Sequence, residues 1–94
     1  MDDILIPAPH GKRWLQDKLN KSIPKQTLQR WRKAADIELV IDENNQFSYW
    51  LADLYLIWQM ITVFNELPTK KKTLKNARKI ALTRLNEVKH NGSN

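Results

Sequence analysis

The sequence contains no cysteine, which excludes disulfides, thiolate zinc sites, cysteine nucleophiles and cysteine-ligated iron–sulfur clusters. Its two glycines, Gly11 and Gly92, are too few for the glycine-rich loops that bind phosphate in nucleotide-binding proteins. The two histidines, His10 and His90, lie far apart and lack other metal-ligating neighbours. With only 94 residues, the chain has room for one domain and little room for a catalytic cleft. We therefore expect no enzyme activity, no cofactor and no metal site.

The sequence also lacks the features of a secretory signal and of a membrane span. Its first ten residues, MDDILIPAPH, are acidic and contain a short apolar run, whereas a signal peptide needs positive charge and a longer run. Residues 47–67 are mostly apolar, but Asp53, Gln59, Asn65 and Glu66 interrupt them, so they fall short of the roughly 20 apolar residues of a span. We expect a cytoplasmic protein without membrane contact, and a bacterial nucleoid or phage-encoded setting fits this expectation.

Charge is distributed in blocks along the chain. The 16 Lys and Arg exceed the 10 Asp and Glu, which gives a formal net charge of +6. Residues 10–35 carry eight bases and one acid, residues 36–67 carry six acids and no base, and residues 68–94 carry eight bases and one acid. An excess of positive charge favours a polyanionic partner. The acidic middle block is either structural or a surface that binds a partner.

Hydrophobic periodicity predicts a mainly α domain with a small β-hairpin and about four helices. Pro7 and Pro9 favour an extended N-terminal arm over residues 1–9. Ser48 is expected to cap the third helix, and Pro68 to end it. The expected elements are helices over 12–20, 25–35, 49–66 and 73–88, a hairpin over 38–48 and a disordered tail over 90–94, so that a single domain spans 10–89.

The second expected helix has two different faces. Leu28, Trp31 and Ala35 are spaced to form a buried stripe, and Ile23 is placed to pack onto Leu28 as a hydrophobic staple. The opposite face is basic and polar, with Lys25, Gln26, Gln29, Arg30, Arg32 and Lys33. Two short helices joined by a tight turn, the second of them basic, form a helix-turn-helix plan, in which the second helix enters the major groove of DNA.

The run from Ile23 to Ile37 resembles the recognition segment of MerR-like winged helix-turn-helix proteins. The Thr27-Leu28 pair followed by Trp31 carries this resemblance, and the hairpin over 39–47, followed by Tyr49 and Asp53-Leu54, is similar to the family's wing and next helix. The resemblance implies double-stranded DNA binding, usually as a dimer, by transcription regulators or by small phage-type excisionases.

This chain departs from the family pattern at several positions. Gln29 stands where the family commonly has Arg, and Ala35 stands where it commonly has Gly. Asp42 and Glu43 replace the basic residues that touch phosphate from the wing, so we expect these acids to point away from DNA or toward a protein partner. A long C-terminal coiled-coil helix is absent from the pattern.

We expect sequence-specific binding of double-stranded DNA by a small transcription regulator. The alternatives are an excisionase-like architectural DNA-binding protein and, in another class, a protein-binding adaptor or inhibitor that docks through its acidic and apolar middle segment. The candidate DNA-binding residues are Arg13, Lys25, Gln26, Thr27, Gln29, Arg30, Arg32 and Lys33. A further basic group either contacts phosphates or keeps the fourth helix soluble: Lys70, Lys71, Lys72 and Lys75.

The third expected helix is apolar on nearly every face. Such a helix must be buried on every side. It is either covered entirely by its own chain or forms half of an interface, and the second reading predicts a homodimer through residues 49–64.

Overall fold

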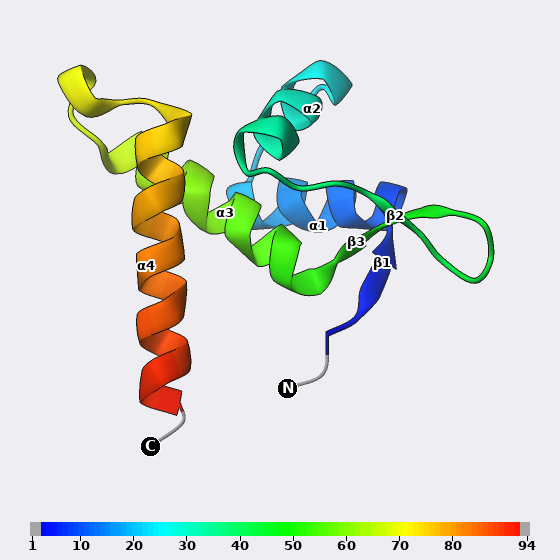
Figure 1. Ribbon diagram of the computed structural model, residues 1–94. Coiled ribbons are helices and arrows are strands. Elements are labelled where there is room, and N and C mark those ends of the chain that lie inside the picture. The colour runs from blue at the N-terminus through cyan, green and yellow to red at the C-terminus, as the bar shows by residue number, and fades with distance from the viewer. Residues whose placement is uncertain (1–2, 93–94) are drawn as a thin grey trace.

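A computed structural model describes the backbone of residues 3–92 and the side chains of residues 3–86. Within this range the chain is mainly helical with a small antiparallel sheet, as the periodicity predicts (Figure 1). The elements in chain order are β1 (Leu5–Pro7), α1 (Ala8–Leu19), α2 (Lys25–Ala34), β2 (Val40–Ile41), β3 (Phe47–Trp50), α3 (Leu51–Glu66), the 3₁₀ turn η1 (Thr69–Lys71) and α4 (Leu74–Gly92). The expected tail over 90–94 is helical as far as Gly92, and residues 93–94 lie outside the described part of the chain.

The N-terminal segment belongs to the sheet and does not stand apart as an arm. The sheet has the order β1-β3-β2, and β1 pairs antiparallel with β3, so that Leu5 lies opposite Trp50 and Ile6 lies opposite Tyr49. The hairpin of β2 and β3 confirms the sequence prediction, but the third strand was not predicted. Pro7 immediately precedes α1, which begins at Ala8, four residues before the start expected at residue 12.

The prediction that Ser48 caps the third helix is wrong. Ser48 lies within β3, and α3 begins three residues later, with Trp50 in the N-cap position and without a side-chain cap of its own. An orphan donor of the first turn is satisfied from the other end of the chain, because Asp3 Oδ1 accepts a hydrogen bond from the Ala52 amide at 3.1 Å. The chain thus uses an aspartate near its N-terminus where the sequence suggested a local serine.

Helix α3 lies at the centre of the core. Its buried side chains are Leu54, Leu56, Ile57, Met60, Ile61 and Val63. Helix α1, the sheet and α4 surround it, and the N-terminal half of α4 crosses α3 and packs against it through Ala77 and Ala81, which are both fully buried (Figure 1). Of the large apolar side chains of α3, only Tyr55 is classed as exposed, at 40%.

The dimer expected through residues 49–64 stays a prediction, because the monomer buries most but not all of the apolar side chains in this range. Within this range Trp50 and Tyr55 are exposed and Leu51, Trp58 and Phe64 are half-buried, whereas the more exposed apolar side chains Ile4, Ile41 and Phe47 lie outside it, on or beside the sheet. None of the described helices, α3 included, is long and apolar enough to cross a membrane.

Helix α1 approaches the sheet closely at Gly11. A Cβ atom built on Gly11 would lie 2.8 Å from Tyr49 Cδ2 and 3.3 Å from Leu54 Cδ2, and real Cβ atoms essentially never show the first distance. Both neighbours are buried, Tyr49 at 3% exposure and Leu54 at 0%. The missing side chain of Gly11 therefore sets the distance between α1 and β3, and with it the position of α1 relative to the hairpin.

Candidate nucleic-acid interface

The turn between α1 and α2 is held by specific local hydrogen bonds. Asn20 ends α1 in the left-handed conformation, with φ of 54°, which asparagine adopts more readily than most residues. Gln16 then connects the two helices, because its side-chain Oε1 accepts a hydrogen bond from the Ile23 amide at 3.0 Å. Ile23 is itself buried in the core together with Leu28, as the staple predicts. These contacts hold the turn between α1 and α2 in a defined conformation.

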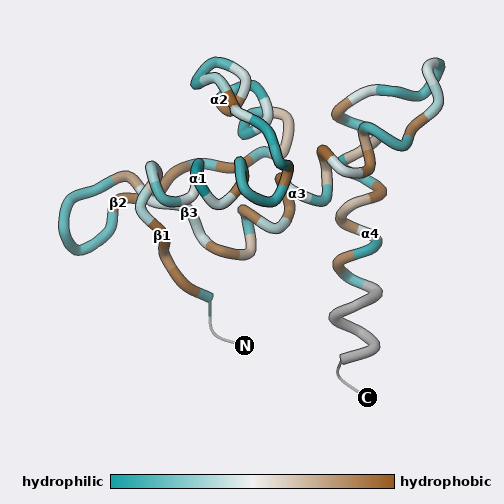
Figure 2. The backbone as a smooth tube through the Cα atoms, turned by 180° about the vertical axis from the view of Figure 1, so that it is seen from behind, coloured by the Kyte–Doolittle hydropathy of each residue, from teal (hydrophilic) through white to brown (hydrophobic). Residues whose placement is uncertain are grey.

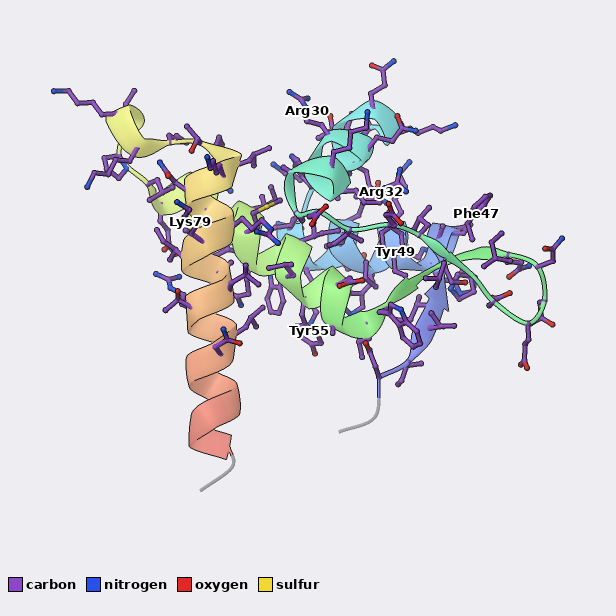
Figure 3. The ribbon with its side chains drawn as sticks, in the orientation of Figure 1. Arg30, Arg32, Phe47, Tyr49, Tyr55 and Lys79 are labelled. Carbon is purple, nitrogen blue, oxygen red and sulfur yellow. The ribbon has the colours of Figure 1, made fainter. Side chains whose placement is uncertain are left out.

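The outer face of α2 is exposed and polar, as predicted from the stripe of Leu28 and Trp31. These two residues are buried on the inner side. Five of the candidate residues are exposed on the outer side, namely Lys25, Gln26, Gln29, Arg30 and Lys33. Arg30 stands on the side of α2 that faces away from the rest of the molecule (Figure 3). We call these five residues the α2 outer face.

The other three candidates of this group occupy different positions. Arg13 is exposed on α1, and Thr27 is half-buried on the flank of α2. Arg32 is also half-buried and lies between α2 and the sheet, close to Tyr49 (Figure 3). Its Nε atom is buried and has no hydrogen-bond partner among the described residues. Arg32 therefore packs against the fold and does not belong to the α2 outer face.

The charge of Arg32 affects the pKa of Tyr49. Burial raises the pKa of the Tyr49 hydroxyl above its usual value, and the positive charge of Arg32 partly offsets this effect. The tyrosine thus stays neutral in the folded protein across the physiological range. Arg32 on α2 and Tyr49 on β3 therefore lie close to each other.

The C-terminal end of α2 is fastened to α4 by a contact that the sequence did not reveal. Arg78 Nε donates a hydrogen bond to the Ala35 carbonyl at 3.1 Å, across 43 residues of sequence. A cation at a helix C-terminus also interacts favourably with the helix dipole. Asp36 follows with φ of 59°, which supplies the left-handed residue that a glycine often provides after a helix. The C-terminal end of α2 is therefore fixed to α4 through Arg78, and the chain turns away from the helix at Asp36.

Lys18 and Lys21, which the sequence analysis did not single out, form cation–π contacts with tryptophan rings. Lys21, in the turn before α2, has its Nζ 5.5 Å from the centre of the Trp31 ring. Lys18 Nζ lies 5.2 Å from the Trp58 ring and 5.6 Å from the Trp14 ring. Cation–π contacts of this kind hold the ammonium close to the surface of the domain. The signal available in the sequence was the spacing of Lys18 one helical turn after Trp14.

The second basic group lies in and around the η1 turn. Lys70, Lys71, Lys72 and Lys75 are all exposed, but the Nζ of Lys72 lies 5.4 Å from the Phe64 ring centre. Thr73 precedes α4 and its Oγ1 accepts a hydrogen bond from the Asn76 amide at 3.1 Å, as an N-cap does. Both backbone views place α2 and the η1 turn at the same, upper end of the molecule, and Figure 2 shows mostly hydrophilic residues in both segments.

The turn of the hairpin is organised by Asp42. Its Oδ1 accepts hydrogen bonds from the amides of Asn44 and Gln46, at 2.9 and 3.0 Å, and its Oδ2 accepts one from the Ser48 hydroxyl at 2.9 Å. The Gln46 amide above all, and then Ser48 and Asn44, lower the pKa of Asp42 below its usual value. Asp42 is thus turned into the hairpin, whereas Glu43 beside it remains exposed. The expectation that Asp42 and Glu43 point away from DNA or toward a protein partner stays a prediction.

The described residues contain no group of three or more His, Asp or Glu side chains placed to hold a metal ion. Comparison of the chain with known protein families, with curated proteins and with solved structures finds no match.

Proposed function

We propose that this protein binds double-stranded DNA through the α2 outer face, as a small sequence-specific transcription regulator of the MerR-like winged helix-turn-helix type. One observation carries the proposal. Three bases and two glutamines project together from a helix whose opposite side is packed into the core. Arginine reads guanine and glutamine reads adenine in the major groove, while lysine binds phosphate.

The anchoring of α2 supports the same proposal. Recognition of base edges requires a helix that is held in a defined position, since a shift of the helix moves every donor at once. Gln16 fixes its N-terminal side through Ile23, and Arg78 fixes its C-terminal side through Ala35. The exposed lysines of the η1 turn at the same end of the molecule are suited to the flanking phosphates.

An excisionase-like architectural role is the second candidate within this proposal. It uses the same α2 outer face, and a chain of 94 residues with one described domain suits it as well as it suits a regulator. Selection of binding sites distinguishes the two roles. A regulator enriches one site that overlaps a promoter, whereas an excisionase enriches sites beside a recombination junction.

The salt dependence of duplex binding tests the proposal. The double variant Lys25→Gln/Lys33→Gln removes two charges from the α2 outer face, and we expect the slope of log K against log salt to become shallower by about 2. The matched control is Lys18→Gln, which removes an exposed lysine that lies against the Trp14 and Trp58 rings, outside the α2 outer face, and leaves the slope unchanged. Absence of duplex binding at low salt, or an equal effect of the control, would contradict the proposal.

The protein-binding adaptor has one observation in its favour, the exposed apolar side chains of the hairpin. An adaptor with an apolar interface keeps its affinity as salt rises, whereas a DNA binder loses it steeply. The same salt series therefore separates the two classes.

A further inference from the structure

The hairpin carries an exposed apolar pair. Ile41 on β2 and Phe47 on β3 lie opposite one another in the register of the two strands, so their side chains share one face of the sheet. They are 59% and 60% exposed, and Phe47 stands out from the hairpin (Figure 3). Glu43 in the adjoining turn is exposed, and no base occurs between residues 36 and 67. We call Ile41, Glu43 and Phe47 the wing surface; it is apolar and acidic.

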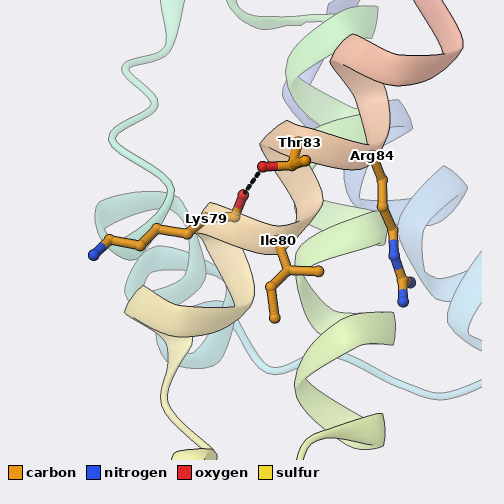
Figure 4. A pocket seen from close by; sticks show the side chains of 4 residues that line it. All are labelled: Lys79, Ile80, Thr83 and Arg84. Carbon is orange, nitrogen blue, oxygen red and sulfur yellow. Dashed lines mark hydrogen bonds between the residues drawn. The ribbon is translucent and has the colours of Figure 1, made fainter.

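A surface of the opposite character lies on α4. Lys79, Ile80, Thr83 and Arg84 line a shallow hollow on this helix (Figure 4). Thr83 donates its hydroxyl hydrogen bond to the Lys79 carbonyl of its own helix at 3.1 Å, which leaves the half-buried Ile80 as an apolar floor. Lys79 and Arg84 are exposed on either side of Ile80. We call these four residues the α4 hollow. It is apolar at its centre and Lys79 supplies positive charge at its rim, whereas Arg84 is paired with Glu66, its Nη1 lying 3.5 Å from Glu66 Oε2.

We propose that the wing surface of one copy of this chain docks in the α4 hollow of a second copy. Phe47 and Ile41 would cover Ile80, and Glu43 would lie beside Lys79, so that apolar groups meet apolar groups and opposite charges face one another. The wing and α4 lie at opposite ends of the molecule in both backbone views, so one chain cannot bring its own two surfaces together (Figures 1 and 2).

The contact is therefore head-to-tail. Each copy presents one wing surface and one α4 hollow, and such a heterologous contact extends into a chain of copies unless rotation closes it into a ring. The α2 outer face contributes to neither surface, so this inference does not depend on DNA binding. It also differs from a two-fold dimer through α3, whose apolar side chains are mostly buried in the monomer.

Sedimentation velocity over a concentration series tests the contact. We expect the average mass of the wild-type chain to rise above the 11.1 kDa of one copy as the concentration increases. Phe47→Thr removes the exposed ring of the wing surface, and Lys79→Glu places a negative charge beside Glu43. Each should raise the dissociation constant by about tenfold or more. Ile4→Thr and Lys70→Glu are the matched controls, because they change an exposed isoleucine and an exposed lysine outside both surfaces.

Mixing the two variants distinguishes this geometry from any symmetric dimer. Phe47→Thr keeps an intact α4 hollow, and Lys79→Glu keeps an intact wing surface. An equimolar mixture should therefore form a complex of two copies that grows no further, although each variant alone remains a monomer. Ile41→Thr repeats the wing test at a second position, and circular dichroism verifies that each variant is folded.

Three results would overturn the inference. The first is a wild-type chain that stays monomeric throughout the series. The second is a dissociation constant of self-association that is the same for Phe47→Thr and Lys79→Glu as for the controls Ile4→Thr and Lys70→Glu. The third is a mixture of Phe47→Thr and Lys79→Glu that remains monomeric while the wild type assembles.

Discussion

Replacing Gly11 with alanine tests the packing that positions the helix-turn-helix. Two opposing effects determine the result. Alanine is favoured over glycine inside a helix by about 1 kcal/mol. Its Cβ, however, would lie 2.8 Å from a ring carbon of Tyr49, and overfilling a packed core costs roughly 1–3 kcal/mol. The clash should prevail, because the atom it meets belongs to a buried ring that has little room to move.

We expect Gly11→Ala to lower the free energy of unfolding by about 1 kcal/mol, which for a domain of this size corresponds to a fall in Tm of roughly 4–8 °C. Urea and thermal unfolding followed by circular dichroism measure this change. The background variant Tyr49→Val is the control, since valine suits a strand and removes the ring carbons that a Cβ on Gly11 would meet.

In the Tyr49→Val background the same Gly11→Ala change should be much less destabilising, because only the 3.3 Å approach to Leu54 Cδ2 then opposes the helix preference. The difference between the two backgrounds is the coupling energy, expected at roughly 1–3 kcal/mol. If Gly11→Ala stabilises the otherwise wild-type protein, or if the coupling is absent, the close approach of α1 to β3 is refuted.

Three further predictions follow from the interface and its supports. Arg30→Ala should weaken binding at the preferred DNA site by ~1–3 kcal/mol and reduce discrimination between sites, and unchanged site preference in competition binding would exclude Arg30 as a reader. Arg78→Met keeps most of the packing but removes the charged donor to Ala35, so it should lower the free energy of unfolding by about 1.5–3 kcal/mol. The amide signals of α2 should broaden in NMR spectra, and unaltered signals would contradict the anchor. Asp42 has a lowered pKa in the folded protein, so its stabilising contribution is complete above the unfolded value of about 3.9 and disappears as the pH falls through the folded value. Asp42→Ala should accordingly remove part of the acid dependence of stability, and an identical pH profile in the variant would show that the turn does not depend on this carboxylate.

Local patterns in the sequence were sufficient for several parts of the fold. The spacing of Leu28, Trp31 and Ala35 predicted the inner face of α2, and all three are buried. The apolar run ending at Ile41, followed by an asparagine-rich turn, predicted the hairpin. These features depend on residues close together in the chain, where periodicity and turn chemistry act directly.

Long-range pairing could not be predicted in the same way. The strand β1 is three residues long and ends in a proline, so it shows no alternation, and its partner lies more than 40 residues away. The Asp3 cap on α3 and the Arg78 contact with Ala35 depend on the same tertiary arrangement.

The position of Arg32 could have been recognised from spacing. It follows Leu28 by four residues, which places it one helical turn further along the same side of α2, near the buried stripe. The prediction that Arg32 binds DNA rested on its charge and not on its place on the helix. Its buried Nε shows that position determined its environment.

An NMR titration with a short DNA duplex tests the central claim most directly, because it locates the contact on the chain. Upon addition of the duplex, we expect the largest amide shift changes between Lys25 and Lys33, smaller changes at Lys70 and Lys71, and nearly none at the buried positions of α3. The changes should diminish when the salt concentration is raised. A titration that leaves residues 25–33 unchanged, or that shifts only the hairpin and α4, would contradict DNA recognition by α2.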